Sequence, residues 1–286
     1  MVKSKGQKVF NIFNIVIMLL LSFCFLAPYW MVFIASFTDE TTLITNGYTL
    51  FPKKLSLDAY IFVLKTNTLM LRSIFNSIVF TLGGVVATTA ISMLYAYPLS
   101  RHYLRGKRFF NFYMVIPMLF GGGLIPTFLI VTSMFDDSYL AIIVPSAMTP
   151  WYAILMRNYF ASLPDSFEEA AKIDGAGHMR VLLKIYIPLS KPIIATIALY
   201  TAVAFWNNWV GPMLYITTKD KYPIQYLVQQ IMLSINNIFG GASGAMIPTE
   251  SVKMACIVLA SLPVIIVYPF LQKYFINGTI VGGVKE

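Results

Sequence analysis

The chain has 286 residues, of which 58% are hydrophobic and only 12% are charged. A soluble domain carries about 25% charged residues, and a soluble chain of this length cannot bury so much apolar surface. The composition therefore excludes an ordinary soluble protein and indicates several membrane spans. The net charge of +9 does not indicate a nucleic-acid partner, because the basic residues lie in short loops between apolar runs.

Six long apolar runs follow one another along the chain. Each is at least as long as the roughly 18 residues that cross hydrocarbon as a helix. The runs are too uniformly apolar for barrel strands, which alternate and are about ten residues long. We therefore expect an all-α integral membrane protein, a single domain over residues 1–286 with six transmembrane helices. The expected spans are residues 9–37, 73–100, 109–134, 138–157, 192–217 and 254–272.

Lysine and arginine residues divide unequally between the two sets of loops. One set contains both termini, the loop 101–108 and the loop 158–191, and with Arg157 it carries 14 of these residues, whereas the other set carries 7. The positive-inside rule places the richer set in the cytoplasm. Both termini are then cytoplasmic, and residues 218–249 form an extracellular loop. A signal peptide or lipoprotein signal is disfavoured by the length of the first run and by bulky Phe23 before Cys24.

The loop 158–191 is expected to contain a short helix that ends at a glycine corner. Ser166 and Glu169 have the spacing of a capping box, which predicts a helix from about residue 167 to residue 174. Gly175 suits the left-handed position that follows a helix. A second helical stretch is expected from about residue 179 to Pro188.

One face of the predicted short helix carries small residues. Phe167, Ala170 and Ala171 share this face at i, i+3, i+4 spacing. A small face on an exposed helix permits close approach of another surface, so we interpret it as a docking site for a partner protein. The alternative is that Glu169 and Gly175 only cap the helix.

Four stretches of the chain resemble a known transporter family. Glu169-Ala170-Ala171, with Asp174-Gly175-Ala176 and then Pro188 and Pro192, resembles the EAA loop of bacterial ABC-importer permeases. The Asp-Gly-Ala form is similar to the carbohydrate branch, that of the maltose-transporter permeases. The other stretches, which look most like permeases for oligosaccharides such as aldouronates or alginate fragments, are residues 123–126, 205–209 and 272–285.

This resemblance implies a division of labour among several chains. It implies a type I ABC-importer permease in the bacterial cytoplasmic membrane, with a second homologous permease subunit, two copies of an ABC ATPase and an extracellular solute-binding protein. The sequence has no Walker A pattern, so we expect no cofactor on this chain, with ATP and Mg held by the ATPase. The resemblance assigns the loop 158–191 to ATPase coupling through Glu169, Ala170, Ala171, Asp174, Gly175 and Pro188.

Two further regions are candidates for contact with the solute or its carrier. Trp206, Asn207, Asn208 and Trp209 lie in the fifth expected span, where aromatic faces beside amides suit a sugar. The alternative is hydrogen bonding between helices with tryptophan anchoring at the interface. In the extracellular loop, Gly240, Gly241 and Gly244 are candidates for contact with the binding protein, or they belong to a disordered connector.

We therefore predict a non-catalytic permease subunit of an ATP-driven importer for a carbohydrate, with an oligosaccharide expected. The alternative within this class is an importer of a non-sugar solute. A membrane-embedded enzyme or an ion-driven carrier is disfavoured because the six runs contain no Asp, Glu or His. No metal site is expected, because His102 and His178 have no His or Cys neighbour at ligand spacing.

Overall fold

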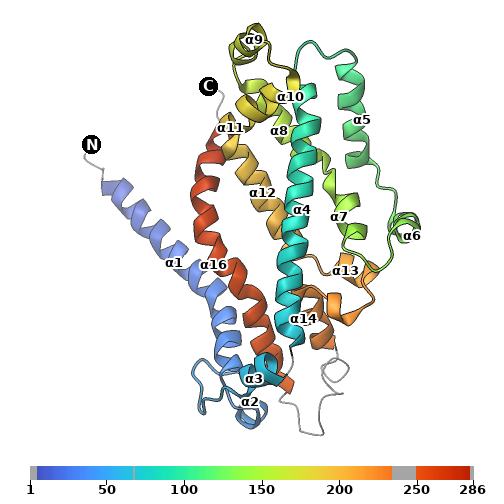
Figure 1. The fold of residues 1–286 in the computed structure, drawn as a ribbon. Helices are drawn as coiled ribbons and strands as arrows, with labels where there is room; N and C mark the ends of the chain where they lie inside the picture. The colour runs from blue at the N-terminus through green and yellow to red at the C-terminus, as the bar shows by residue number, and fades with distance from the viewer. Residues whose placement is uncertain (1–4, 67, 234–248, 284–286) are drawn as a thin grey trace. The chain divides into compact units, whose positions relative to one another are not determined.

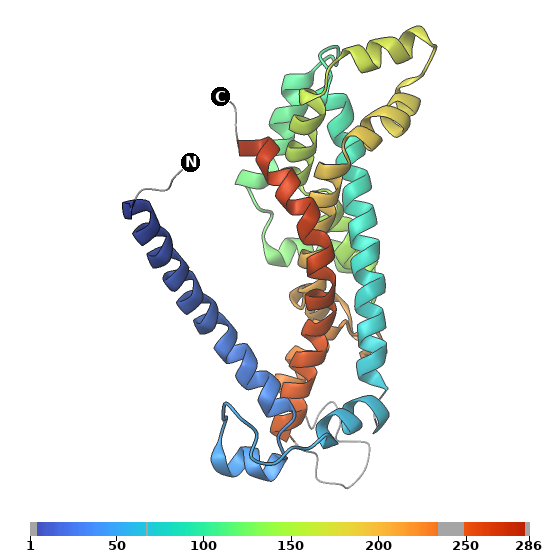
Figure 2. The same cartoon turned by 90° about the vertical axis from the view of Figure 1, so that its left-hand side faces the viewer.

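The computed structural model describes residues 5–66, 68–233 and 249–283, and these residues form helices with no β-strand, as predicted (Figures 1 and 2). Contacts divide the chain into two units, residues 1–71 with 228–262, and residues 72–227 with 263–286. Three helices in the described part are long and apolar enough to cross a membrane. The number rises to as many as six when each bent pair of helices is counted as one span.

The first unit contains the long helix α1 (Lys5–Ser36) and several short elements. From Val9 to Leu26 the large apolar side chains of α1 are exposed, as suits a helix surrounded by lipid. The other elements are α2 (Glu40–Asn46), α3 (Asp58–Ile61), the π-helical turn η1 (Phe62–Thr66) and the first part of α16 (Thr249–Gly283).

Within this unit the carboxylate of Glu40 caps the start of α16. It accepts the backbone N–H groups of Glu250 and Ser251 at 2.9 and 2.8 Å, and the Ser251 hydroxyl at 2.7 Å. The first N–H groups of a helix have no hydrogen-bond partner inside the helix, and a negative charge beside them is also attracted to the positive end of the helix dipole. The cap therefore fixes α2 to the start of α16.

The second unit holds nearly all of α4, the helices from α5 to α13, the start of α14 and the last part of α16, whereas residues 228–233 of α14 belong to the first unit. Helix α8 packs against α5 and α12, whereas α7 packs against α6 and α13. The elements are α4 (Leu69–Ser100), α5 (Lys107–Leu119), α6 (Leu124–Met134), α7 (Leu140–Ala147), α8 (Pro150–Ser162), α9 (Ser166–Ile173), α10 (His178–Val181), the π-helical turn η2 (Leu182–Tyr186), α11 (Ile187–Leu189), α12 (Lys191–Trp206), α13 (Val210–Tyr215), the 3₁₀ turn η3 (Lys219–Lys221) and α14 (Ile224–Leu233).

The expected span 109–134 is not one continuous helix. Helices α5 and α6 meet at 110° across Gly121, Gly122 and Gly123. Gly123 has φ +84°, which is strained for any residue with a Cβ. The glycines therefore explain why the apolar run bends sharply where its hydropathy alone predicts a straight helix.

The expected spans 138–157 and 192–217 are also broken. Helices α7 and α8 meet at 44°, because Pro150 opens α8 and holds Thr149 in an extended conformation. Helix α12 ends at Trp206, and α13 begins only at Val210. Each break places irregular backbone inside an apolar run, which is tolerated at membrane depth only where protein or a cavity satisfies it.

Helices α9 and α10 lie at one end of the second unit, beside the C-terminal end of α4 (Figures 1 and 2). The apolar core beneath them contains Tyr97 from α4, Phe160 from α8, Tyr186 from η2 and Ile197 from α12. The loop after α4 and the loop after α8, which the sequence places on the same side of the membrane, therefore meet at this end.

Candidate functional site

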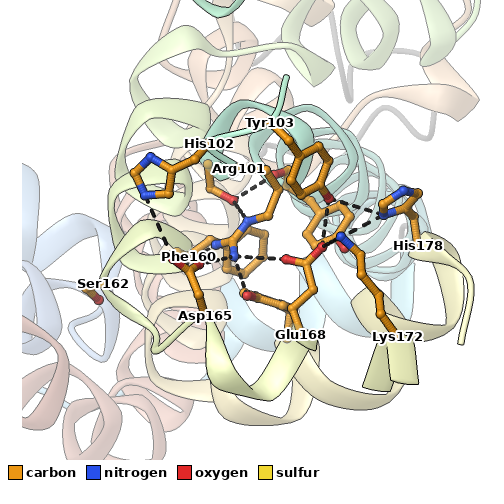
Figure 3. Close-up of polar contacts among 12 residues, drawn as sticks. Arg101, His102, Tyr103, Phe160, Ser162, Asp165, Glu168, Lys172 and His178 are labelled. Carbon is orange, nitrogen blue, oxygen red and sulfur yellow. Dashed lines mark hydrogen bonds and ion pairs between the residues drawn. The ribbon is translucent and has the colours of Figure 1, made fainter. Parts of the chain in front are cut away.

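A buried arginine directly after α4 is the centre of a polar cluster at this end (Figure 3). Arg101 is only 2% exposed, and its guanidinium group donates to the carboxylates of Asp165 and Glu168, each at 3.1 Å. It also donates to the backbone carbonyl of Phe160 at 2.7 Å and to the hydroxyl of Tyr186. A planar guanidinium group, unlike a lysine, offers the several fixed donors that this arrangement uses.

Glu168 is the carboxylate that this cluster buries most deeply. Its side chain is 5% exposed, and Oε2 accepts the bond from Arg101. Oε1 accepts the Tyr103 hydroxyl at 2.7 Å and lies 2.8 Å from the ammonium group of Lys172. The Lys172 ammonium group in turn lies 4.1 Å from the centre of the Tyr103 ring. Because a buried charge is costly unless it is paired and hydrogen-bonded, this complete set of partners stabilises the ionised carboxylate.

The protonation of this cluster follows from its contacts. Burial raises the pKa of Glu168, but the bonds from Lys172, Tyr103 and Arg101 outweigh burial and hold the pKa below its usual value. Burial and the neighbouring Glu168 carboxylate raise the pKa of the Tyr103 hydroxyl. Near neutral pH the carboxylate is therefore ionised and the phenol remains a donor to it.

The glycine corner after α9 is built as predicted. Gly175 has φ +74°, in the left-handed region. Its N–H donates to the carbonyl of Lys172 at 3.0 Å, and the N–H of Ala176 donates to the carbonyl of Ala171 at 2.9 Å. These two bonds form a complete Schellman motif with Asp174 at the C-cap position.

The predicted capping box at the start of α9 is wrong. Ser166 is already the first helical residue, and Asp165 takes the cap position without a side-chain bond to the helix. The Asp165 carboxylate is directed to Arg101 instead. Pairing with a buried guanidinium group therefore replaces the local cap that the spacing of Ser166 and Glu169 predicts.

The inward and outward faces of α9 also differ from the predicted ones. Ala171 packs against the apolar core, so it does not share an exposed face with Phe167 and Ala170. The Glu169 side chain is exposed and forms no hydrogen bond or ion pair with the described residues. The outward face therefore carries Phe167, Glu169 and Ala170, with Ile173 86% exposed at its end.

The other residues expected in coupling lie outside the polar cluster. Asp174 is exposed at the end of α9, and Pro188 is exposed within α11. Sequence reasoning singled out Glu169 but missed Glu168, although the i, i+4 spacing of Glu168 and Lys172 is a recognisable ion-pair signal. The burial of Arg101 has no comparable signal in the sequence.

Residues 80–281 match the family described as "Binding-protein-dependent transport system inner membrane component". The chain belongs to this family. It is therefore a membrane subunit of an ABC importer, a permease that performs no catalysis and spans the cytoplasmic membrane several times. A member of this family works with an ATPase, a solute-binding protein and a second permease.

Individual proteins similar to this permease cover nearly all of it. The "Polygalacturonan/rhamnogalacturonan transport system permease protein YtcP" of Bacillus subtilis (strain 168) is 40% identical over 263 residues, which are 90% of this chain and 92% of the relative. "Protein LplC" of the same organism is 38% identical over 286 residues, covering 99% and 97%. A crystal structure of a bacterial ABC transporter involved in import of the acidic polysaccharide alginate has a chain with a TM-score of 0.85 and 34% identity, covering 96% of this permease and 99% of that chain.

The residues expected along the transport path lie around the break between α12 and α13. Trp206 ends α12 and is buried, whereas Asn207 and Trp209 are exposed in the connection. The Asn208 amide oxygen accepts the backbone N–H of Gly211 at 2.9 Å, which caps the start of α13. These four residues do not form one continuous face, and of the four Asn208 lines the cavity of about 230 Å³ found in this part of the described chain.

The glycines expected to contact the binding protein, Gly240, Gly241 and Gly244, lie outside the described residues. Before them, the expected loop 218–249 contains the helix α14, from Ile224 to Leu233.

Proposed function

We propose that this permease imports a carbohydrate, and specifically an oligosaccharide, with ATP hydrolysed by two copies of a separate ATPase. A second permease subunit completes the pore, and an extracellular binding protein delivers the sugar. ATP and Mg are held by the ATPase. The single observation that carries the coupling role is the difference between the two faces of α9. Its inward face is bonded to Arg101, whereas its outward face carries exposed apolar side chains and a carboxylate that pairs with none of the described residues.

The outward face of α9 has the composition of a protein contact. Phe167 is 45% exposed and Ile173 is 86% exposed, and the exposed Met179 of α10 follows closely in the chain. Several large apolar side chains exposed on one short segment are typical of an interaction surface. The exposed Glu169 carboxylate pairs with a basic group of the ATPase in this proposal. Such a charge-assisted hydrogen bond contributes on the order of 1.5–3 kcal/mol to binding.

The topology that suits this role has six spans and both termini in the cytoplasm. It counts α5 with α6 as one span, α7 with α8 as another and α12 with α13 as the fifth, and it places α9 on the side that is richer in lysine and arginine. Under this proposal Glu169, Ala170, Asp174 and Gly175 lie at the ATPase surface, whereas Ala171 supports α9 from within. Pro188 belongs to the connection that returns to the membrane.

The carbohydrate substrate is supported by the relatives. One similar permease is named for polygalacturonan and rhamnogalacturonan, and one similar structure belongs to a transporter of alginate. Both names refer to acidic polysaccharides, so acidic oligosaccharides are the first substrates to test. An importer of a non-sugar solute is the outcome that contradicts this part of the proposal.

The coupling role is tested by reversing the charge of Glu169. In the complete importer, Glu169→Lys should reduce co-purification of the ATPase and uptake at least tenfold while leaving membrane insertion unchanged. The exposed Asp136, between α6 and α7, provides a matched control, because Asp136→Lys reverses a charge on the side assigned to the exterior. Unchanged co-purification and uptake in Glu169→Lys would contradict the assignment of α9.

The substrate is tested by uptake into proteoliposomes that contain the complete importer and its binding protein. The panel is trigalacturonate, trimannuronate, maltotriose and glycerol 3-phosphate. We expect ATP-dependent uptake of at least one of the three saccharides. Uptake of glycerol 3-phosphate alone, or of no panel member, would reject the carbohydrate proposal.

A further inference from the structure

A hydroxyl-lined cavity lies within the second unit, away from the polar cluster of Arg101. Its volume is about 230 Å³, and Phe205 and Ala204 form its apolar part. It has no charged residue among its described lining. The polar side chains that line it are Thr88, Ser146, Thr149, Tyr152, Thr201 and Asn208.

The cavity forms where two of the expected spans are broken. Ser146 lies in the last turn of α7, Thr149 lies in the break between α7 and α8, and Asn208 lies in the break between α12 and α13. Broken helices whose irregular backbone lines a cavity are the usual construction of substrate sites in membrane transporters. Two breaks that meet at one polar cavity are therefore difficult to explain by helix packing alone.

The hydroxyl group of Thr88 is the strongest evidence for a ligand. Thr88 is 1% exposed, and its hydroxyl has no hydrogen-bond partner among the described residues. A threonine inside a helix usually satisfies its hydroxyl at the carbonyl four residues earlier, as Thr196 does with Pro192 at 2.9 Å. Thr88 does not use this bond and instead lines the cavity.

A second buried threonine supports the same conclusion. Thr201 is 1% exposed and also lines the cavity. It interacts with the phenol of Tyr152, but its hydroxyl forms no hydrogen bond of normal geometry with a described residue. The Thr88 hydroxyl therefore keeps hydrogen-bonding capacity that no described residue uses, and Thr201 adds a second hydroxyl beside the cavity, which the Tyr152 phenol contacts.

We propose that this cavity is a saccharide subsite in the transport path, which binds one sugar ring through its hydroxyl groups. Whole-ligand pockets occupy about 300–1,000 Å³, so the smaller volume here fits part of an oligosaccharide. Neutral donors and acceptors suit sugar hydroxyls, and the Phe205 ring offers an apolar surface to a ring face. The subsite rests on the proposed carbohydrate function and extends it, because it assigns sugar contact to this permease itself.

The first test removes single hydroxyl groups without changing side-chain size. In the complete importer, Thr88→Val and Thr201→Val should each lower saturated uptake of trigalacturonate about threefold to tenfold, the effect of one neutral hydrogen bond. Maltotriose replaces trigalacturonate if it is the panel member that the wild type transports. Thr88→Ser, which keeps the hydroxyl, should retain uptake, and Thr196→Val serves as a control because that hydroxyl bonds its own helix.

The second test remains informative if a valine variant fails to assemble. Thr88→Cys is introduced into an importer with Cys24→Ser and Cys256→Ser, and its reaction with methyl methanethiosulfonate is timed. The same transported saccharide should slow this reaction at least threefold, and it should leave a Thr196→Cys control unchanged.

The outcomes separate the subsite from the proposed function. If the wild type transports a saccharide but Thr88→Val transports equally well and Thr88→Cys is not protected, the cavity holds water only and the subsite is rejected. If the wild type transports no saccharide, the carbohydrate function fails and the subsite fails with it.

Discussion

Removing Arg101 should release α9 from the rest of the permease. In Arg101→Ala, the Asp165 carboxylate can be hydrated because its side chain is already 55% exposed. The Glu168 carboxylate is only 5% exposed and keeps Lys172 and Tyr103 as close partners, with His178 more distant at 3.9 Å. Breaking a buried ion pair from one side costs about 3–5 kcal/mol. We therefore expect the opening equilibrium of the loop 158–191 to increase by about 10² to 10³-fold or more.

Limited trypsin digestion of inside-out membrane vesicles measures this opening. The loop contains Lys172, Arg180 and Lys184, which become accessible to trypsin when α9 separates from the Arg101 cluster. Arg101→Ala should be cleaved in the loop at least tenfold faster than the wild type, and its co-purification with the ATPase should fall. Arg105→Ala is the matched control, because Arg105 is exposed on the same loop and forms no ion pair with the described residues.

A double substitution separates the ion pair from general damage. Replacing both partners of a buried pair by apolar residues of similar volume is often nearly neutral, whereas removing one partner is not. Arg101→Met with Glu168→Met should therefore be cleaved more slowly than Arg101→Met alone. If Arg101→Ala matches Arg105→Ala in the rate of cleavage and in ATPase binding, the claim that Arg101 holds α9 against the permease is refuted.

Three further substitutions test separate features of the fold. Gly175→Val should cost at least about 1–2 kcal/mol at φ +74° and reduce uptake, whereas Gly177→Val, at φ −72°, should not, and equal uptake in the two would contradict the Schellman corner. Gly84→Ala places a Cβ 2.5 Å from the Phe205 ring and should destabilise the protein by about 1–3 kcal/mol in thermal unfolding, whereas Gly83→Ala, 3.2 Å from a flexible isoleucine end, should be nearly neutral. Burial raises the pKa of Asp137, but bonds from Lys221, Thr218 and Thr217 outweigh it and lower the pKa. The stabilisation of the folded protein by the ionised Asp137 carboxylate is therefore complete above the unfolded pKa of about 3.9, and it is lost as the pH falls through the lower pKa of the folded state. Asp137→Asn should accordingly lower Tm by a few degrees at pH 7 and by progressively less below pH 4.

The sequence was sufficient for features that depend on local spacing. The apolar runs predicted an all-α membrane protein, and Gly175 predicted the left-handed corner that the structure contains. The cap at Ser166 was wrong because a long-range ion pair with Arg101 competes for Asp165, and no local pattern reports such a contact. The distinction between Glu168 and Glu169 has the same origin, since adjacent residues on a short helix face opposite environments that only the fold defines.

The breaks within the apolar runs show a different limit of sequence reasoning. Hydropathy averages over a window, so it detects that residues 109–134 are apolar but not that three glycines turn the chain by 110°. The angle of each break depends on which neighbouring helix each fragment packs against. The cavity at Thr88 is equally invisible, because its lining comes from α4, α7, α8 and α12 and from the segments that follow α7 and α12.

The contacts of Arg101 also explain how a movement at α9 reaches the membrane helices. The guanidinium group follows directly after α4, bonds the last turn of α8 through the Phe160 carbonyl, and bonds η2 through Tyr186. Glu168 therefore attaches α9 to three elements at once, through a group that has almost no access to water. A displacement of α9 that leaves these bonds intact must move the ends of α4 and α8 together, as in rigid-body closure, whereas a loop without the buried pair would absorb the displacement. Uptake in Arg101→Ala should consequently fall further than its residual ATPase binding, which distinguishes a transmitting role from a docking role.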